Sequence, residues 1–432
     1  MNGSSITPIL RFSGVFLGAA LALPLSGICS VQLASPTSVS TAKATHRTLH
    51  RKRPAATSLR ASAAATPLVH KVVARPGTGA RVSAASLRTT RSVATVTRNA
   101  TTSALIRGGP WLEPTYADST QGDRIDGEDL NVRRAAVEAL GEYNGSVVVV
   151  DPSNGRVLTM VNQKEALSSG FQPCSTVKIS VALAGLSEKA VSSTEKVRLP
   201  SGQKMDMTYA LAHSINLYFA TLGEKLGFEK VAYYSHLFGY GEKAGLNIVG
   251  EQPGRYPTAP PQNGGVGMLT SFGEEIQQTP LQLAALMSAI ANGGTLYYLQ
   301  YPENQTEVQN FVARVKRHLD IEKLIPEVTP GMRGAVEFGT AHRAREDGAI
   351  AGKTGTCTND HTHLGWFGSF NESGNRKLVV VVLLTGGRPA IGPMAAGIAG
   401  DIYRLLGERN YFASATPVTP ASLIASQICC SK

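Results

Sequence analysis

The segment "GAIAGKTGT" (348–356) places a lysine inside a short apolar run that is typical of a β-strand. An unpaired lysine is costly to bury, so Lys353 stands out in this segment. Because side chains alternate along a strand, Thr354 and Thr356 share one face and Lys353 points to the other. Gly355 would let another backbone or a ligand approach closely. We therefore expect a polar site at this strand.

A second polar pair occurs in "FQPCSTVKIS" (171–180), where a serine and a lysine lie three residues apart just after a proline. If a helix begins near Ser175, the two side chains are neighbours, and the amine of Lys178 could take the proton from the hydroxyl. The helix N-terminus would stabilise the resulting charge. Lys178 can act as a base only if burial and a neighbouring cation lower its pKa.

A third motif, "SIN" (214–216), lies between the other two. In an extended segment Ser214 and Asn216 would point to the same side. Each motif is weak alone, because serine and lysine three residues apart also occur elsewhere in this chain, for example at Ser193 and Lys196. The order of all three motifs is the informative feature.

Hydrophobic periodicity predicts the order helix, two strands, helical block, three strands, helix, which indicates an α+β architecture with one sheet. The expected elements are a helix at 129–143, a hairpin at 145–162, a helical block at 175–292, a helix near 329–340, three strands within 348–386 and a helix at 394–406. In the helical block, Thr279 and Pro280 suit the N-cap and the first turn of one helix.

These motifs, in this order, resemble the transpeptidase domain of penicillin-binding proteins, which shares its fold with serine β-lactamases. The resemblance covers roughly residues 130–406 and includes "ALAHSINLYFATLGEKLG", "TPLQLAALMSAIANGGTL", "GMRGAVEFGTA" and "HLGWFGSF". It implies an antiparallel sheet of about five strands flanked by helices, with an all-helical subdomain.

The resemblance also implies which residues form the site. The catalytic residues would be Ser175, Lys178 and Ser214, and the substrate-binding residues would be Asn216, Lys353, Thr354, Gly355 and Thr356. In this scheme the serine is the nucleophile, the first lysine is the base, and the second serine relays a proton to the leaving amine. The backbone N–H groups of Ser175 and Thr356 would form the oxyanion hole. No cofactor and no metal ion is expected, since serine acyl transfer needs neither.

The implied activity is that of a DD-transpeptidase or DD-carboxypeptidase acting on peptidoglycan stem peptides that end in D-Ala-D-Ala, with β-lactams acylating the same serine. Two alternatives stay open. "PCSTVKI" (173–179) resembles the serine motif of class D β-lactamases, which suggests a β-lactamase or β-lactam sensor. A catalytically silent cell-wall scaffold is the second alternative. The asparagine of "SIN" and the long block before "KTGT" favour the penicillin-binding protein.

The basic charge of the chain is confined to its N-terminal region. Residues 1–112 contain fourteen lysines and arginines and no acidic residue, so the formal charge of +11 falls to −3 for the rest. We therefore expect no nucleic-acid binding. The apolar run at 12–34 predicts a signal peptide or membrane anchor, and hence export to the periplasm or the outer face of the inner membrane. Cys29 as a lipidated residue is a weaker alternative, because isoleucine precedes it.

The expected domain organisation has four parts: a signal peptide or anchor at 1–34, a disordered basic tether rich in Ala, Ser, Thr and Arg at 35–110, the transpeptidase domain at 111–410 and a tail at 411–432. We expect neither a glycosyltransferase domain nor a large pedestal domain, because only the tether precedes residue 110.

The cysteines are Cys29, Cys174, Cys357, Cys429 and Cys430. They form no regular framework, so we expect the large core rather than disulfides to supply stability. Cys174, where the family commonly has a small residue such as glycine, is expected to be a buried structural thiol. A zinc site at "CTNDHTH" (357–363) and metal binding or oxidation at the last two cysteines are weaker alternatives.

Overall fold

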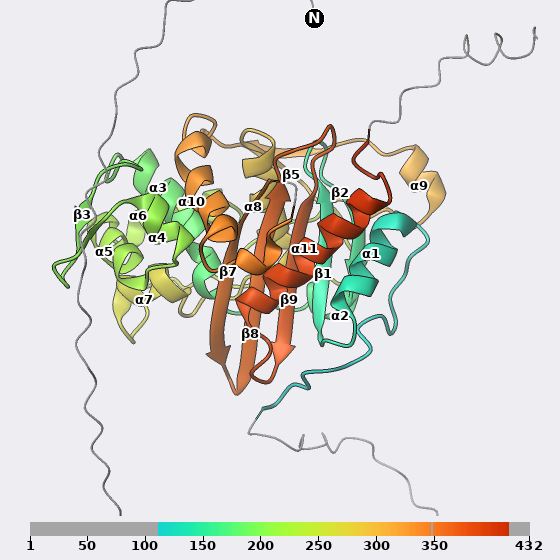
Figure 1. Ribbon diagram of the computed structural model, residues 1–432, viewed down its shortest axis with the longest axis horizontal. Coiled ribbons are helices and arrows are strands. Elements are labelled where there is room, and N and C mark those ends of the chain that lie inside the picture. Colours follow the sequence, from blue (N-terminus) through green and yellow to red (C-terminus); the bar gives the residue numbers. More distant parts are fainter. Residues whose placement is uncertain (1–110, 347–348, 414–432) are drawn as a thin grey trace, which may run out of the picture. The chain divides into compact units, whose positions relative to one another are not determined.

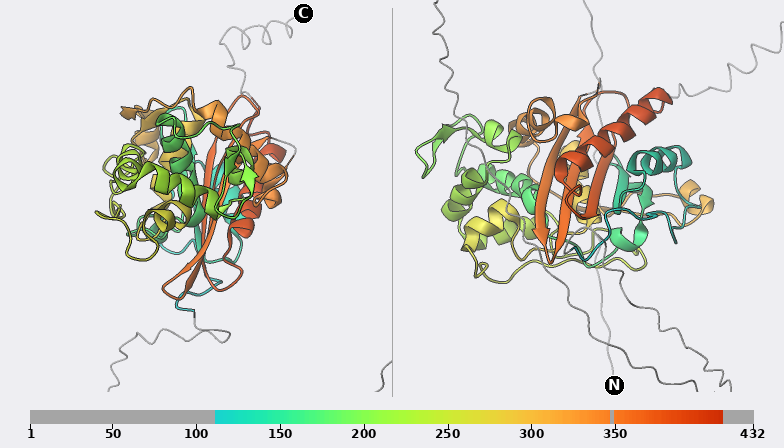
Figure 2. Two further views of the ribbon diagram at one scale, coloured as in Figure 1. Left: turned by 90° about the vertical axis from the view of Figure 1, so that its left-hand side faces the viewer. Right: turned by 60° about the horizontal axis from the view of Figure 1, so that its bottom comes forward.

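A five-stranded antiparallel sheet lies at the centre of the computed structural model, which describes residues 111–346 and 349–413. The strands, in spatial order, are β2 (Arg156–Val161), β1 (Gly145–Asp151), β9 (Val379–Gly386), β8 (Thr362–Asn371) and β7 (Ile350–Asn359). Helices cover both faces of the sheet (Figure 1; Figure 2, left). The predicted α+β architecture is confirmed, and the strand that carries "KTGT" is an edge strand.

Both faces of the sheet are buried, which explains why its strands read as continuous apolar runs rather than alternating ones. In β1, Val147 and Val149 belong to the hydrophobic cluster on one face, whereas Val148 and Val150 belong to the cluster on the other. Strand β9 alternates in the same way. The sheet therefore separates two hydrophobic cores.

The first face is covered by α1 (Leu130–Leu140) and α11 (Gly392–Glu408), close to the predicted positions of both helices. Helix α1 begins after Asp129, whose side chain accepts hydrogen bonds from the backbone N–H groups of Asn131 and Val132. In α11 the buried residues include three alanines, Ala395, Ala396 and Ala399, which let the helix approach the sheet closely. This face is mostly apolar.

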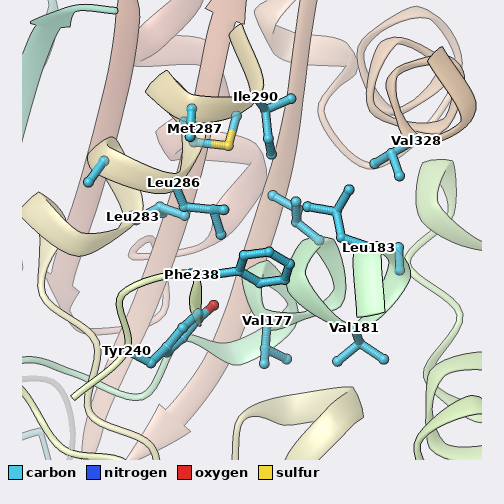
Figure 3. Packing of buried hydrophobic residues seen from close by; sticks show 14 of the residues in the cluster. Val177, Val181, Leu183, Phe238, Tyr240, Leu283, Leu286, Met287, Ile290 and Val328 are labelled. Atoms are coloured by element: carbon cyan, nitrogen blue, oxygen red, sulfur yellow. The ribbon is translucent and has the colours of Figure 1, made fainter. Parts of the chain in front are cut away.

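The second face packs against α8 (Pro280–Ala291), in which every residue is buried. Thr279 caps the helix and forms a reciprocal capping box with Gln282, and Pro280 lies in the first turn, as the sequence predicts. Figure 3 shows why α8 has no exposed side: Leu286 and Ile290 face side chains of the helical subdomain, including Phe238. The sheet lies on the other side of the helix.

The predicted helical block is the helical subdomain of the structure. It contains the 3-10 helix η1 (Cys174–Val177) and the helices α3 (Lys178–Ser187), α4 (Met207–Ala212), α5 (Asn216–Leu226), α6 (Phe228–Leu237) and α7 (Gly265–Phe272). Two small two-stranded sheets were not predicted, because their strands are only two to four residues long: β3 (Val197–Arg198) with β4 (Lys204–Met205), and β5 (Thr295–Tyr297) with β6 (Val315–His318).

The remaining elements connect these layers. They are α2 (Gln163–Ala166), α9 (Gln305–Gln309), α10 (Ile325–Glu337) and the 3-10 helix η2 (His342–Ala344). Helix α10 begins earlier than the predicted 329–340, because Pro326 occupies its first turn and the helix continues through Pro330.

None of the helices in the described ranges is both long and apolar enough to span a membrane. The apolar run at 12–34, the tether at 35–110 and most of the C-terminal tail, including Cys29, Cys429 and Cys430, lie outside the described residues.

Candidate active site

The serine motif lies at the start of a helix, as the sequence predicts. Ser175 is in the 3-10 turn η1, and Lys178 is the first residue of α3. The turn places the two side chains on one face, and Nζ of Lys178 lies 2.6 Å from Oγ of Ser175. The lysine is fully buried, whereas 9% of the serine is exposed. A hydroxyl and an amine are therefore in direct contact at the edge of the interior.

The "SIN" motif is a turn, so the prediction that it is extended was wrong. The chain must reverse between the end of α4 at Ala212 and the start of α5 at Asn216, and Ser214 adopts a left-handed conformation with φ +56° to do so. The two polar side chains converge nonetheless. Lys178 Nζ lies 2.5 Å from Oδ1 of Asn216 and 3.2 Å from both Oγ and the carbonyl oxygen of Ser214.

The "KTGT" segment lies on the edge strand β7. Lys353 is fully buried on the face toward the helical subdomain, and its Nζ donates to Oγ of Ser214 at 2.9 Å and to the carbonyl oxygen of Thr354 at 2.9 Å. Ser214 therefore contacts both lysines. Three segments that are far apart in the sequence meet around this one hydroxyl.

The two threonines of β7 point to the opposite face. Oγ1 of Thr354 lies 2.6 Å from Oγ1 of Thr340, in the loop after α10, and Oγ1 of Thr356 accepts a hydrogen bond of 2.8 Å from the backbone N–H of Gly392, the first residue of α11. Thr354 is buried and Thr356 is exposed. Sequence reasoning missed Thr340, because nothing near "GTA" (339–341) marks a polar contact with a strand.

Gly355 lies where β7 approaches the serine turn. A Cβ atom at this position would lie 2.8 Å from the carbonyl oxygen of Pro173 and 3.2 Å from Cγ2 of Thr176. On the neighbouring strand, Nε1 of Trp366 donates to the carbonyl oxygen of Gln172 at 2.9 Å. Glycine is thus required for close packing of the strand against the turn that carries Ser175.

Burial sets the protonation of the two lysines. It lowers the pKa of Lys178 to about 6, and the nearby Lys353 contributes further. Burial also lowers the pKa of Lys353, to about 7. The hydrogen-bond acceptors around both amines are hydroxyl, carbonyl and amide oxygens of neutral groups, which do not restore a charge to either lysine. At neutral pH Lys178 is therefore mostly an uncharged amine.

The chemical consequence is a continuous set of polar contacts from Ser175 through Lys178 and Ser214 to Lys353. A neutral amine has one lone pair, and the hydroxyl of Ser175 is within reach to donate to it. The same amine keeps two protons for Asn216 and Ser214. This arrangement can remove a proton from one hydroxyl and deliver it to another.

A disulfide joins Cys174 to Cys357, with a Cα–Cα distance of 5.6 Å across a sequence separation of 183 residues. The prediction of an unpaired structural thiol at Cys174 was wrong, although the residue is buried. The bond also removes the thiolate of Cys357 from the zinc alternative. The pairing has no local signal in the sequence, because the two cysteines are 183 residues apart and only the fold brings them together.

A pocket of about 640 Å³ lies elsewhere in the described structure, lined by residues that include Leu246, Val249, Tyr301, Phe311 and Arg314. None of the motif residues lines it. The candidate active site is instead the polar cluster beside the edge strand, where 9% of Ser175 is accessible and Thr356 is exposed.

Comparison with known families agrees with this geometry. The family model of the penicillin binding protein transpeptidase domain matches residues 145–404, which is more than half of the chain. The chain therefore belongs to the penicillin-binding protein transpeptidase family, as the sequence motifs indicated. The matched region contains all three motifs.

Among curated relatives, the chain is 28% identical over 317 residues to the stage V sporulation protein D of Bacillus subtilis, covering 60% of this chain and 48% of the relative. It is 26% identical over 252 residues to the peptidoglycan D,D-transpeptidase FtsI of Escherichia coli K12, covering 49% of this chain and 43% of the relative. The chain thus spans about half the length of the curated relatives it matches.

Among solved structures, the fold resembles that of Pseudomonas aeruginosa PBP2 in complex with WCK 5153, with a TM-score of 0.56 and 23% identity over 68% of this chain and 79% of that one. It also resembles penicillin binding protein 3 from Mycobacterium tuberculosis, with a TM-score of 0.51 and 22% identity over 65% of this chain and 76% of that one. At these identities the likeness supports the fold.

Proposed function

We propose that this protein is a serine DD-transpeptidase, or a DD-carboxypeptidase when water replaces the acceptor amine, acting on peptidoglycan stem peptides that end in D-Ala-D-Ala. The observation that carries the proposal is the 2.6 Å contact between Ser175 Oγ and the buried, largely neutral amine of Lys178. The names of the relatives, several of which are peptidoglycan D,D-transpeptidases, support the same reaction.

In the acylation step, Lys178 takes the hydroxyl proton of Ser175 while Oγ attacks the carbonyl carbon of the penultimate D-Ala. Asn216 holds the amine in place through its 2.5 Å contact. The resulting tetrahedral oxyanion accepts hydrogen bonds from the backbone N–H groups of Ser175 and Thr356, which lie on the turn and the strand that pack together at Gly355.

Collapse of the tetrahedral intermediate requires a proton on the departing amine of the terminal D-Ala. Ser214 Oγ is 3.2 Å from Lys178 Nζ, so it can pass the proton from the lysine to the leaving group. The contact of Lys353 with the same oxygen orients this hydroxyl. An amine of a second stem peptide, or water, then resolves the acyl-enzyme by the reverse sequence.

The substrate is expected to bind along β7. An edge strand has a free side of backbone N–H and carbonyl groups, to which an extended peptide can add as a further strand. Thr356 accepts the Gly392 N–H and so keeps its own hydroxyl proton for the terminal carboxylate. The Thr354–Thr340 pair likewise has one proton left to donate. Lys353 adds positive charge only in the fraction of molecules in which it is protonated, because its pKa is lowered to about 7.

The domain organisation and location extend this proposal. Residues 111–410 would form the catalytic domain, held outside the cytoplasm by the apolar segment in 1–34 and the basic segment 35–110. If the first segment is not cleaved, it anchors the protein in the membrane. Peptidoglycan stem peptides and β-lactam antibiotics are the proposed ligands.

The test is to incubate the protein with a fluorescent penicillin and to follow the covalent adduct by mass spectrometry over hours. We expect a long-lived adduct on Ser175, none in Ser175→Ala, and a normal adduct in Ser187→Ala. Ser187 is the matched control, because it lies on α3 and its described contacts, with the carbonyl oxygen of Leu183 and the hydroxyl of Tyr234, involve no residue of the three motifs. Release of a D-Ala residue from a stem peptide, with and without an added amine, separates transpeptidation from hydrolysis.

The other outcomes correspond to the remaining alternatives. Rapid adduct formation followed by release of hydrolysed drug would indicate a β-lactamase. A folded protein that forms no adduct and releases no D-Ala would contradict both enzymatic functions and leave the scaffold.

A further inference from the structure

The disulfide joins the two segments that the proposed reaction needs to hold together. Cys174 immediately precedes Ser175, and Cys357 immediately follows Thr356. These two neighbours supply the nucleophile and both proposed oxyanion-hole N–H groups. The covalent link is therefore one residue away from the reacting groups on each side.

Other contacts hold the same junction without the disulfide. Trp366 donates a hydrogen bond to the carbonyl oxygen of Gln172, and Gly355 packs against Pro173. Two large hydrophobic clusters flank the sheet, and although Cys174 belongs to one of them and Cys357 packs against it, the clusters consist almost entirely of other apolar side chains. Breaking the disulfide should therefore leave the domain folded, and its effect should be local.

The backbone conformation of Cys174 indicates how the site would change without the bond. Its φ is +52°, a left-handed conformation that costs a non-glycine residue free energy unless its surroundings enforce it. The conformation of this residue determines where the N–H of Ser175 points. Without the bond to β7, Cys174 is free to relax, and the N–H and Oγ of Ser175 would move with it.

We propose that the Cys174–Cys357 disulfide is a positioning element of the acylation site, which holds the Ser175 turn against the Thr356 strand so that acylation is fast only in the oxidised protein. This inference rests on the proposed function. The two cysteines are positioning residues, since they act through Ser175 and Thr356 and do not contact the substrate.

The bond is open to reduction from solvent on one side. Cys357 is partly exposed, whereas Cys174 is fully buried. A dithiol such as dithiothreitol would attack Sγ of Cys357, and Cys174 would leave as a thiolate and take up a proton. The second thiol of the reagent then releases Cys357 as a thiol, and the reagent departs as a cyclic disulfide, so two electrons are transferred.

The experiment compares acylation of the full chain by a β-lactam before and after dithiothreitol treatment, resolving the drug's dissociation constant from the acylation rate constant. We expect the rate constant to fall about tenfold or more, as a small misplacement of reacting atoms does, with little change in drug binding. Circular dichroism establishes that the reduced protein is folded. The double variant Cys174→Ala/Cys357→Ala must be insensitive to the reagent, because any remaining effect would come from Cys29, Cys429 or Cys430.

A matched pair of variants tests the role of the backbone. Cys174→Gly/Cys357→Ser and Cys174→Ser/Cys357→Ser both lack the bond, but only glycine accepts a positive φ without strain. We expect the glycine variant to recover most of the lost acylation rate and the serine variant to stay slow. A purely structural bond would give no such difference between two folded proteins.

Several results would overturn the inference. Equal acylation rates in the oxidised and reduced protein would rule out positioning while leaving the proposed function intact. Unfolding on reduction would show that the bond stabilises the fold as a whole and does not act locally on the acylation site. Equal rates in the glycine and serine variants would remove the role of the Cys174 backbone. If the oxidised protein forms no acyl adduct, the proposed function itself fails, and this inference fails with it.

Discussion

The two faces of the central sheet bury side chains equally well but to opposite effect. On one face Val380 and Val382 of β9 belong to the same hydrophobic cluster as Ile402 of α11, and all three are fully buried. On the other face, at the β7 edge, Lys178 and Lys353 are just as inaccessible. Burial of the apolar groups stabilises the fold, whereas burial of the lysines costs stability and gives a neutral amine near physiological pH. Stability and chemistry should therefore be separable by mutation.

The largest expected effect is on the polar face. Lys178→Met keeps the volume of the side chain and removes the base, so acylation of Ser175 should fall by about 10²–10⁴-fold. The protein should stay folded, because a buried amine is replaced by an apolar group. The measurement is the acylation rate with a fluorescent penicillin, and an activity within tenfold of the wild type would show that another group is the base.

A substitution on the apolar face should lower stability and leave acylation unchanged. Ile402→Ala creates a cavity under the sheet and should lower the free energy of unfolding by about 2–5 kcal/mol. The acylation rate per folded molecule should stay at the wild-type value. Denaturant unfolding and active-site titration with penicillin measure the two quantities. A loss of acylation rate in the folded variant would mean that the two faces are coupled.

The pH dependence of acylation sharpens the comparison. Lys178 must be neutral to accept the proton, and its pKa is lowered to about 6, so the acylation rate should fall as the pH drops through about 6. With an unperturbed lysine the rate would instead fall as the pH drops through about 10. The rate is measured from pH 5 to 9 on the folded protein, and an ascending limb well above pH 8 would show that the amine is not desolvated as described.

The smallest expected effect is on the pH dependence of stability. The folded-state pKa of Lys353, about 7, is below that of the unfolded chain, so the unfolded chain binds more protons between these values and stability rises with pH across this window. The cost of burial is greatest below pH 7 and disappears at high pH. In Lys353→Met the free energy of unfolding should rise less steeply with pH, because one fewer proton is released on folding. Denaturant titrations at pH 7 and 9 would detect this difference. An unchanged slope would contradict the depressed pKa.

Much of the fold could be predicted because its signals are local. The valines of β1, the Thr279 cap and the apolar pattern of α11 each indicate their element within a few residues. The prediction failed at "SIN", where the geometry depends on how α4 and α5 pack rather than on the preference of Ser214. Thr340 was missed for a similar reason, since its partner is a threonine on a strand formed later in the chain.

The sequence by itself determined the family, the order of the elements and the residues that carry the motifs, because these depend on residue types at short spacings. Only the tertiary structure decided that Lys178 and Lys353 share the hydroxyl of Ser214 and that both are buried. It also decided that Cys174 pairs with Cys357. A pKa shift and a disulfide both depend on which distant segments meet and how well water is excluded there, and no short stretch of sequence contains that information.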